Sequence, residues 1–231
     1  TFDASYPPVE GMTNLLWTLL SSLWIAAFTH IDPIHTARLL GAMLFLGSIA
    51  ATYTLVLNLQ EQPDRTGRVA ATLSALLVAS SGSMAYYALS GLETGLWVAL
   101  YCYSLLVIQR LLRGQSSGRW TLLATLCALA MTRPEGVLVS AILLIGLWVI
   151  EGRSRTALKL LIGYGMFLVA LELFRLWYYG SLVPNTYFAK PPGGMLGMKY
   201  LGDYLVAGVA VLGLLPLILA PGLSGLSLLI A

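Results

Sequence analysis

Two short polar stretches place a carboxylate beside groups that bind anions. Residues 90–95 read Ser-Gly-Leu-Glu-Thr-Gly and residues 132–136 read Thr-Arg-Pro-Glu-Gly, and an apolar run follows each of them. Both have the Ser/Thr-x-x-Glu pattern of a capping box, in which a hydroxyl and a carboxylate satisfy free amides at a helix start. A helix start also attracts anions, and Arg133 adds a charge suited to a phosphate. The stretches predict helix caps, an anion site, or both, with Glu93 and Glu135 as the carboxylates.

A third stretch, residues 175–190, combines aromatic rings with hydrogen-bond donors. The rings of Tyr178 and Tyr179 could hold a sugar, while Asn185 and Lys190 could donate to hydroxyls or to a phosphate. The same composition also fits a membrane interface, where Trp and Tyr are enriched and Gly and Pro end a helix. Both interpretations stay open at this point.

The remaining polar residues carry weaker signals. Glu10 is bracketed by two prolines and a glycine, so either a rigid loop presents it or it is a solvated acid in a turn. Glu172 and Arg175 are spaced i, i+3 on a helix, and we expect them to form a structural ion pair. His30 and His35 have no further convergent ligand, and we predict no metal site there.

The composition identifies the environment in which these residues work. Of 231 residues, 58% are apolar and only 10% are charged, against about 25% charged in a soluble domain. The mean hydropathy is +0.82. These values predict an integral membrane protein with the lipid bilayer as a partner. They exclude disordered, collagen-like, disulfide-stapled and nucleic-acid-binding classes.

The apolar runs predict an all-α, polytopic transmembrane helix bundle with about seven spans. We expect an additional helix over 13–28 to be juxtamembrane or re-entrant on the outer side, with Trp17 and Trp24 as interfacial anchors. The predicted spans are 34–59, 68–83, 91–112, 119–132, 135–150, 157–178 and 200–220.

Alternate loops are basic, which predicts the orientation of the spans. The loops around 61–68, 110–119 and 151–159 hold eight basic and three acidic residues, whereas the rest of the chain is slightly acidic. The basic loops are therefore expected on the cytoplasmic side. Residues 86–94, 132–135 and 178–199 are then expected on the outer face of the membrane.

We interpret residues 1–231 as one transmembrane domain cut at both ends, because the chain starts at Thr1 without a Met and stops inside an apolar run. Residues 1–33 would form an outer loop and the juxtamembrane helix. Residues 34–220 would form the spans, and 221–231 would begin an incomplete segment.

Four motifs in order carry a resemblance to a known family. They are Val-Glu-Gly-x-Thr-Asn-x-Leu-Trp at 9–17, Ser-Gly-Leu-Glu-Thr-Gly-Leu at 90–96, Thr-Arg-Pro-Glu-Gly at 132–136, and Tyr-Tyr-Gly-x-x-x-Pro-Asn-Thr-x-x-Ala-Lys at 178–190. Together they resemble the GT-C superfamily of integral membrane glycosyltransferases, in particular bacterial members of the arabinofuranosyltransferase type that use polyprenyl-phosphate sugars.

The resemblance implies an active site at the outer face of a bacterial inner membrane. There a sugar moves with inversion from a polyprenyl-phosphate donor to an extracytoplasmic glycan or other acceptor. It also implies a catalytic Asp as base a few tens of residues before the first motif. Asp3 is too close to that motif, so the base is expected upstream of Thr1 and the chain alone should be inactive.

Roles for this chain's own residues follow from that implied reaction. Arg133 is the first candidate to bind the donor phosphate and Lys190 the second, because a departing phosphate needs its charge stabilised. The supporting carboxylates are Glu10, Glu93 and Glu135, and the candidates for sugar or acceptor binding are Tyr178, Tyr179 and Asn185.

Two other functions fit the same composition. A transporter or flippase for a lipid-linked sugar would be equally apolar, but such proteins place ionisable groups near the midplane and often show inverted repeats. A non-catalytic membrane assembly subunit is the third alternative. No cofactor is required by the sequence, and the use of a divalent metal is left open.

Overall fold

The computed structural model describes residues 8–60, 64–115, 118–182 and 184. The chain divides into two compact units, Thr1–Tyr187 and Phe188–Ala231, and all described residues belong to the first. They form eight helices without a strand, which agrees with the predicted all-α class. The helices are α1 (Leu15–Ala27), α2 (Pro33–Leu57), α3 (Arg65–Ala79), α4 (Gly82–Leu89), α5 (Thr94–Leu112), α6 (Arg119–Thr132), α7 (Pro134–Ile150) and α8 (Arg155–Tyr179).

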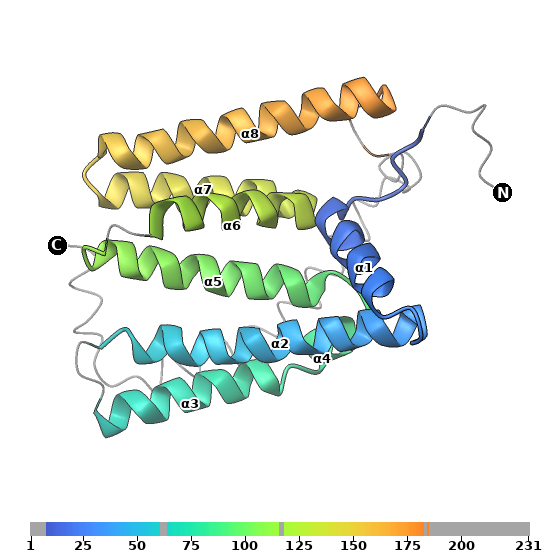
Figure 1. The fold of residues 1–231 in the computed structure, drawn as a ribbon. Coiled ribbons are helices and arrows are strands. Elements are labelled where there is room, and N and C mark those ends of the chain that lie inside the picture. Colours follow the sequence, from blue (N-terminus) through green and yellow to red (C-terminus); the bar gives the residue numbers. More distant parts are fainter. Residues whose placement is uncertain (1–7, 61–63, 116–117, 183, 185–231) are drawn as a thin grey trace, which may run out of the picture. The chain divides into compact units, whose positions relative to one another are not determined.

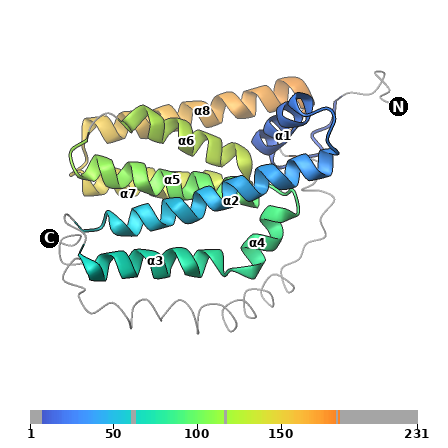
Figure 2. The same ribbon diagram turned by 60° about the horizontal axis from the view of Figure 1, so that its bottom comes forward.

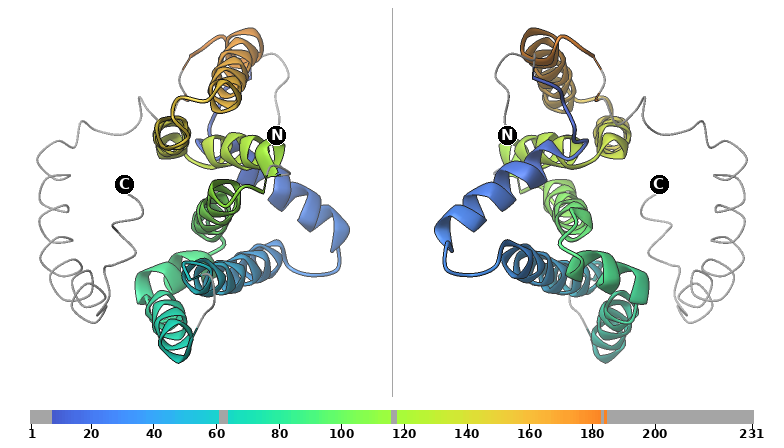
Figure 3. Two further views of the ribbon diagram at one scale, coloured as in Figure 1. Left: turned by 90° about the vertical axis from the view of Figure 1, so that its left-hand side faces the viewer. Right: turned by 90° about the vertical axis from the view of Figure 1, so that its right-hand side faces the viewer.

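The long helices of this unit lie side by side, and α1 crosses one end of them (Figure 1). Helix α2 packs between α3 and α5, α5 packs on α6, and α6 contacts both α7 and α8. The end-on views in Figure 3 show the same succession of neighbours. Helix α1, the first helix of the chain, contacts both α2 and α6.

The core lies where α5 to α8 meet. Its fully buried side chains are Leu122, Leu126, Leu129, Leu144 and Leu147. All five come from α6 and α7, which only Arg133 separates along the chain. Their partners from α5 and α8 are Val107, Leu111, Leu160 and Tyr164.

Five of the predicted spans correspond to α2, α5, α6, α7 and α8 within a few residues, but the predicted span 68–83 is wrong as a single helix. Helix α3 ends at Ala79 and α4 begins at Gly82, with a bend of 57° between them, visible in Figure 2. Ser80, the C-cap residue of α3, donates its hydroxyl to the carbonyl of Leu77, and Ser81 is extended. Two serines followed by a glycine thus interrupt the run.

Length and composition qualify three of the described helices to cross a membrane, namely α2, α5 and α8. The bent pair of α3 and α4 qualifies as a fourth if it counts as one span. Helices α1, α6 and α7 are apolar but shorter, so the described residues do not establish the predicted seven spans. The predicted segments 200–220 and 221–231 lie outside the described residues.

The helices α2, α3, α5, α6, α7 and α8 alternate in direction along the chain, which sorts the polar segments to two ends. The start of α5, the turn between α6 and α7, and the end of α8 lie at the end that α1 crosses (Figure 1). The starts of α3, α6 and α8, with the basic segments predicted to face the cytoplasm, lie at the opposite end. The sequence predicted this separation; which end faces outward stays a prediction.

Glycines allow the elements at the first end to approach closely. A Cβ on Gly95 would lie 2.9 Å from the carbonyl oxygen of Gly41, which brings the start of α5 against α2. A Cβ on Gly136 would collide with the carbonyl oxygen of Leu129, across the turn between α6 and α7. Two glycines of the sequence motifs therefore act by close packing.

Candidate functional site

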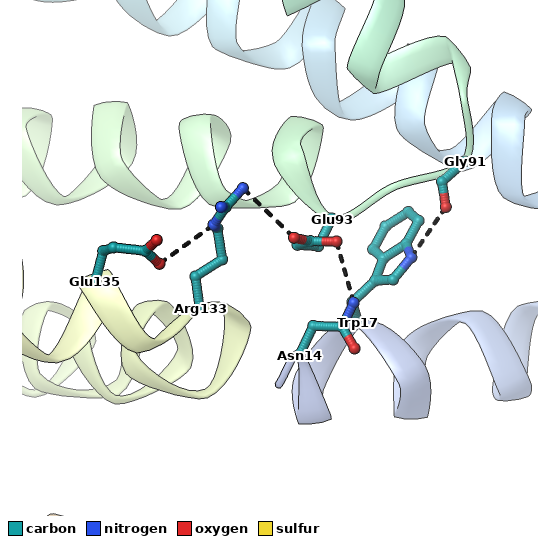
Figure 4. Close-up of polar contacts among 6 residues, drawn as sticks. All are labelled: Asn14, Trp17, Gly91, Glu93, Arg133 and Glu135. Carbon is teal, nitrogen blue, oxygen red and sulfur yellow. Dashed lines mark hydrogen bonds and ion pairs between the residues drawn. The ribbon is translucent and has the colours of Figure 1, made fainter. Parts of the chain in front are cut away.

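Arg133 joins the two polar stretches that the sequence singled out (Figure 4). It is extended between α6 and α7, at φ −153° and ψ 148°, the conformation favoured before a proline such as Pro134. Its Nη1 lies 3.4 Å from Oε1 of Glu93, which precedes α5, and its Nε donates to Oε2 of Glu135 at 3.4 Å. The guanidinium therefore bridges the starts of α5 and α7.

The capping boxes predicted for these stretches are wrong. Glu93 and Arg133 are the N-cap residues of α5 and α7, and neither helix has a side-chain cap. The hydroxyl of Ser90 donates to the carbonyl of Tyr86 at 2.6 Å, and that of Thr132 to the carbonyl of Ala128 at 2.8 Å. Both hydroxyls bond back toward the preceding helix, and the two carboxylates are oriented toward Arg133 instead.

The exposure of the three charged side chains suggests how the cluster could meet a ligand. The exposed fraction is 16% for Glu93, 37% for Arg133 and 64% for Glu135. The side chain of Arg133 thus remains partly exposed, although both carboxylates contact its guanidinium. An anion bound at Arg133 would therefore lie beside carboxylates that can accept from hydroxyl groups.

Helix α1 is fastened to the same cluster. Nδ2 of Asn14 donates to Oε2 of Glu93 at 3.0 Å, and the indole Nε1 of Trp17 donates to the carbonyl of Gly91 at 3.1 Å. Gly91 has a φ of +77°, which a glycine adopts without strain. Trp17 is 6% exposed, so its predicted role as an interfacial anchor is wrong: it is buried against the turn before α5.

A second ion-pair group connects the first motif to α8. Oε1 of Glu10 lies 3.3 Å from Nε of Arg175, and Nη1 of Arg175 donates to Glu172 at 2.6 Å. The pair of Glu172 and Arg175 was predicted and is confirmed. Glu10, however, is 3% exposed, so the interpretation as a solvated acid is wrong. Burial raises the pKa of Glu10, and the Arg175 guanidinium opposes that rise.

The end of α8 presents the aromatic residues of the third stretch. The rings of Phe174 and Tyr178 are stacked, with centroids 5.6 Å apart, and Tyr179 meets Tyr178 edge to face at 4.8 Å. Gly180, in the left-handed region at φ +68°, ends the helix. Tyr178 is exposed, as a sugar platform requires, and so is the neighbouring Trp177. The other two candidates of this stretch, Asn185 and Lys190, lie outside the described residues.

Within the described ranges, no three His, Cys, Asp or Glu side chains gather closely enough to hold a metal ion. The pair formed by His30 and His35 likewise has no third ligand of these types there.

The comparisons with known proteins give one relative. The chain is 27% identical over 216 residues to the terminal beta-(1->2)-arabinofuranosyltransferase of Mycobacterium tuberculosis, an alignment that covers 85% of this chain and 33% of that enzyme. The chain thus spans about a third of the length of the relative it matches. No protein-family model and no solved structure matches the chain.

Asn14 is the site residue that the sequence did not single out. Asparagine just before a helix normally indicates an N-cap, and that local explanation hides its contact with Glu93. The first motif contained the only signal, because Asn14 lies in it together with Glu10 and Trp17. All three residues contact segments that are far away in the sequence.

Proposed function

We propose that this chain is part of a membrane glycosyltransferase. The distant match to an arabinofuranosyltransferase supports this function, and the apolar helices support a membrane environment. The observation that carries the proposal is the convergence of the motifs: segments around residues 14, 93 and 133 are joined through side-chain contacts at one end of the helices.

The proposed donor is a sugar linked to polyprenyl phosphate, and Arg133 binds its phosphate. In the reaction an acceptor hydroxyl oxygen attacks the anomeric carbon, the bond from that carbon to the phosphate oxygen breaks, and the hydroxyl proton passes to a base. We assign that base to a segment upstream of Thr1. The phosphate leaves with an added negative charge, which a fixed guanidinium stabilises without reorganisation. Glu93 and Glu135 supply that fixation, and Lys190 is the second proposed phosphate ligand.

The acceptor is proposed to be an extracytoplasmic glycan that approaches the end of α8. The exposed ring of Tyr178 and the adjoining Tyr179 offer apolar faces for a sugar ring, and Asn185 is the proposed hydroxyl partner. Attack by the acceptor on the face opposite the phosphate inverts the anomeric carbon. The basic end of the helices is proposed to face the cytoplasm of a bacterium.

The position of the charges favours an enzyme over a transporter of lipid-linked sugars. Transporters place their ionisable groups near the bilayer midplane, in interrupted helices. Here Glu93, Arg133 and Glu135 lie at helix starts, and Arg175, in the last two turns of α8, contacts Glu10 from the segment before α1.

A transfer assay with membranes containing the full-length protein tests the proposal. Radiolabelled polyprenyl-phosphate sugars are supplied, and incorporation into glycan is measured for wild type, Arg133→Gln and the control Arg113→Gln at the opposite end. Loss of one transition-state charge partner typically costs about 10²–10³-fold in rate, so we expect that loss in R133Q and wild-type rates in R113Q. Absence of transfer from every donor would refute the function, and full activity of R133Q would refute the role of Arg133.

A further inference from the structure

Asn14 occupies the N-cap position of α1 but does not cap it. Its side chain makes no hydrogen bond to the amides of its own helix, although capping is the common reason for an asparagine at that position. Its Nδ2 instead donates to Glu93 at 3.0 Å. The hydroxyl of Thr18 lies 3.3 Å from both Oδ1 and the backbone carbonyl of Asn14. That hydroxyl is within donating distance of both oxygens, and the NH₂ group faces Glu93.

Glu93 divides its two oxygens between two partners. Oε2 accepts from Asn14, and Oε1 lies 3.4 Å from Nη1 of Arg133. The side chain is only 16% exposed, so water cannot readily replace either partner. If the amide were lost, the carboxylate could turn both oxygens toward Arg133 or rotate away from it. Glu135 holds Nε of Arg133 directly. The contact at Nη1, by contrast, runs through Glu93 to Asn14.

We propose that Asn14 is a positioning residue for Arg133, acting through Glu93. The amide holds one oxygen of Glu93, which fixes the other oxygen against the guanidinium and keeps the exposed part of Arg133 directed at an incoming phosphate monoester. This inference rests on the proposed function for the identity of that phosphate. It explains why the first motif includes an asparagine, since an aspartate there would set a second carboxylate against Glu93 and could not donate to it.

Binding of polyprenyl monophosphate, without a sugar, tests the inference independently of catalysis. The full-length protein in lipid nanodiscs is titrated with this lipid, and the affinity is measured for wild type, Asn14→Leu, Arg133→Gln and the double variant. Leucine keeps the approximate size of asparagine and removes the amide. The control is Ser22→Ala on the same helix, because the Ser22 hydroxyl donates to Thr18 within α1. Unfolding temperatures are recorded for every variant.

We expect each single variant of the cycle to bind about tenfold more weakly, as befits loss of an interaction with a charged group. The double variant should bind no more weakly than R133Q, because Asn14 acts only through Arg133. Asn14→Gln, which retains an amide donor, should recover part of the affinity, and S22A should bind as wild type.

Three results would overturn the inference: additive losses in the double variant, wild-type affinity of N14L, or no binding of the lipid by the wild-type protein. A purely structural role of Asn14 would lower the unfolding temperature without the non-additive loss of affinity. Binding that follows the expected pattern without any sugar transfer would leave this inference standing and refute the proposed function alone.

Discussion

The carboxylate of Glu10 lies 3.3 Å from the guanidinium of Arg175, and it is almost completely buried there. Arg175 also holds the more exposed Glu172, so one cation near the end of α8 serves two acids. This contact fastens the segment before α1 to α8, while Asn14 and Trp17 fasten α1 to the turn before α5. The first motif thus links α1 and the segment before it to both the turn before α5 and α8.

Truncation of Glu10 should therefore destabilise the protein more than truncation of Glu172. Removing one partner of a buried ion pair is strongly destabilising, whereas an exposed pair contributes about 0–1 kcal/mol. Because Arg175 keeps Glu172, we expect Glu10→Ala to cost about 1–3 kcal/mol. Chemical unfolding in detergent of E10A and the matched control Glu172→Ala measures the difference. An equal loss of stability in the two variants would contradict the expectation that Glu10 stabilises the protein more than Glu172 does.

The pH dependence of stability should report the burial of Glu10. Burial raises the pKa of Glu10 above its ordinary 4.5, with Arg175 opposing and Glu172 adding to the rise. The folded protein therefore keeps the Glu10 proton to higher pH than the unfolded chain does. The contribution of Glu10 to the free energy of unfolding is therefore fully present below pH 4.5. It decreases as the pH rises through the pKa that Glu10 has in the folded protein.

Glu10→Gln should remove that decrease, because glutamine does not titrate. The measurement compares the unfolding temperatures of wild type and E10Q at successive pH values from 4 upward. We expect wild type to lose stability relative to the variant as pH rises. The opposite trend would mean that Arg175 lowers the pKa of Glu10 more than burial raises it.

Gly136 of the second polar stretch should be intolerant of a side chain for reasons of packing alone. A Cβ there would collide with the carbonyl oxygen of Leu129, and overpacking typically costs about 1–3 kcal/mol. On the same helix, Gly146 has nothing within 4 Å of an added Cβ, so Gly146→Ala should be neutral or stabilising by up to about 1 kcal/mol. Unfolding of G136A and G146A in detergent checks this. Equal stability of the two would show that α7 shifts to accommodate the methyl group.

The helices could be predicted because each long apolar run is a local property of the chain. Runs such as 119–132 and 135–150 match α6 and α7 closely. The break between α3 and α4 was missed because Ser80, Ser81 and Gly82 are all tolerated inside an apolar run, and hydropathy does not detect backbone bonding by serine hydroxyls. The separation of the basic end from the motif-bearing end was predictable because basic loops and motif-bearing loops alternate along the chain. Since the chain reverses direction from one long helix to the next, the two kinds of loop gather at opposite ends.

The site could be predicted only where its contacts are local. The pair of Glu172 and Arg175 follows from helical spacing, and it is present at 2.6 Å. The contacts of Glu10 with Arg175 and of Asn14 with Glu93 join distant segments, so no spacing rule identifies them. The capping boxes failed for a related reason: the pattern fits a cap, but Arg133 offers Glu93 a charged partner that a neutral amide cannot match.

Trp17 and Trp24 lie on the same short helix but should respond differently to replacement by phenylalanine. The indole of Trp17 is buried and donates to the carbonyl of Gly91 at 3.1 Å, so Trp17→Phe loses a hydrogen bond and leaves a gap, at a cost of about 1–3 kcal/mol. The buried Nε1 of Trp24 makes no hydrogen bond among the described residues. Trp24→Phe removes that unsatisfied donor and keeps an aromatic ring beside Phe28, so its cost should be smaller. The free energies of unfolding of both variants in detergent test this difference. A larger loss of stability in W24F than in W17F would mean that α1 is held mainly through Trp24 and not through its contact with the turn before α5.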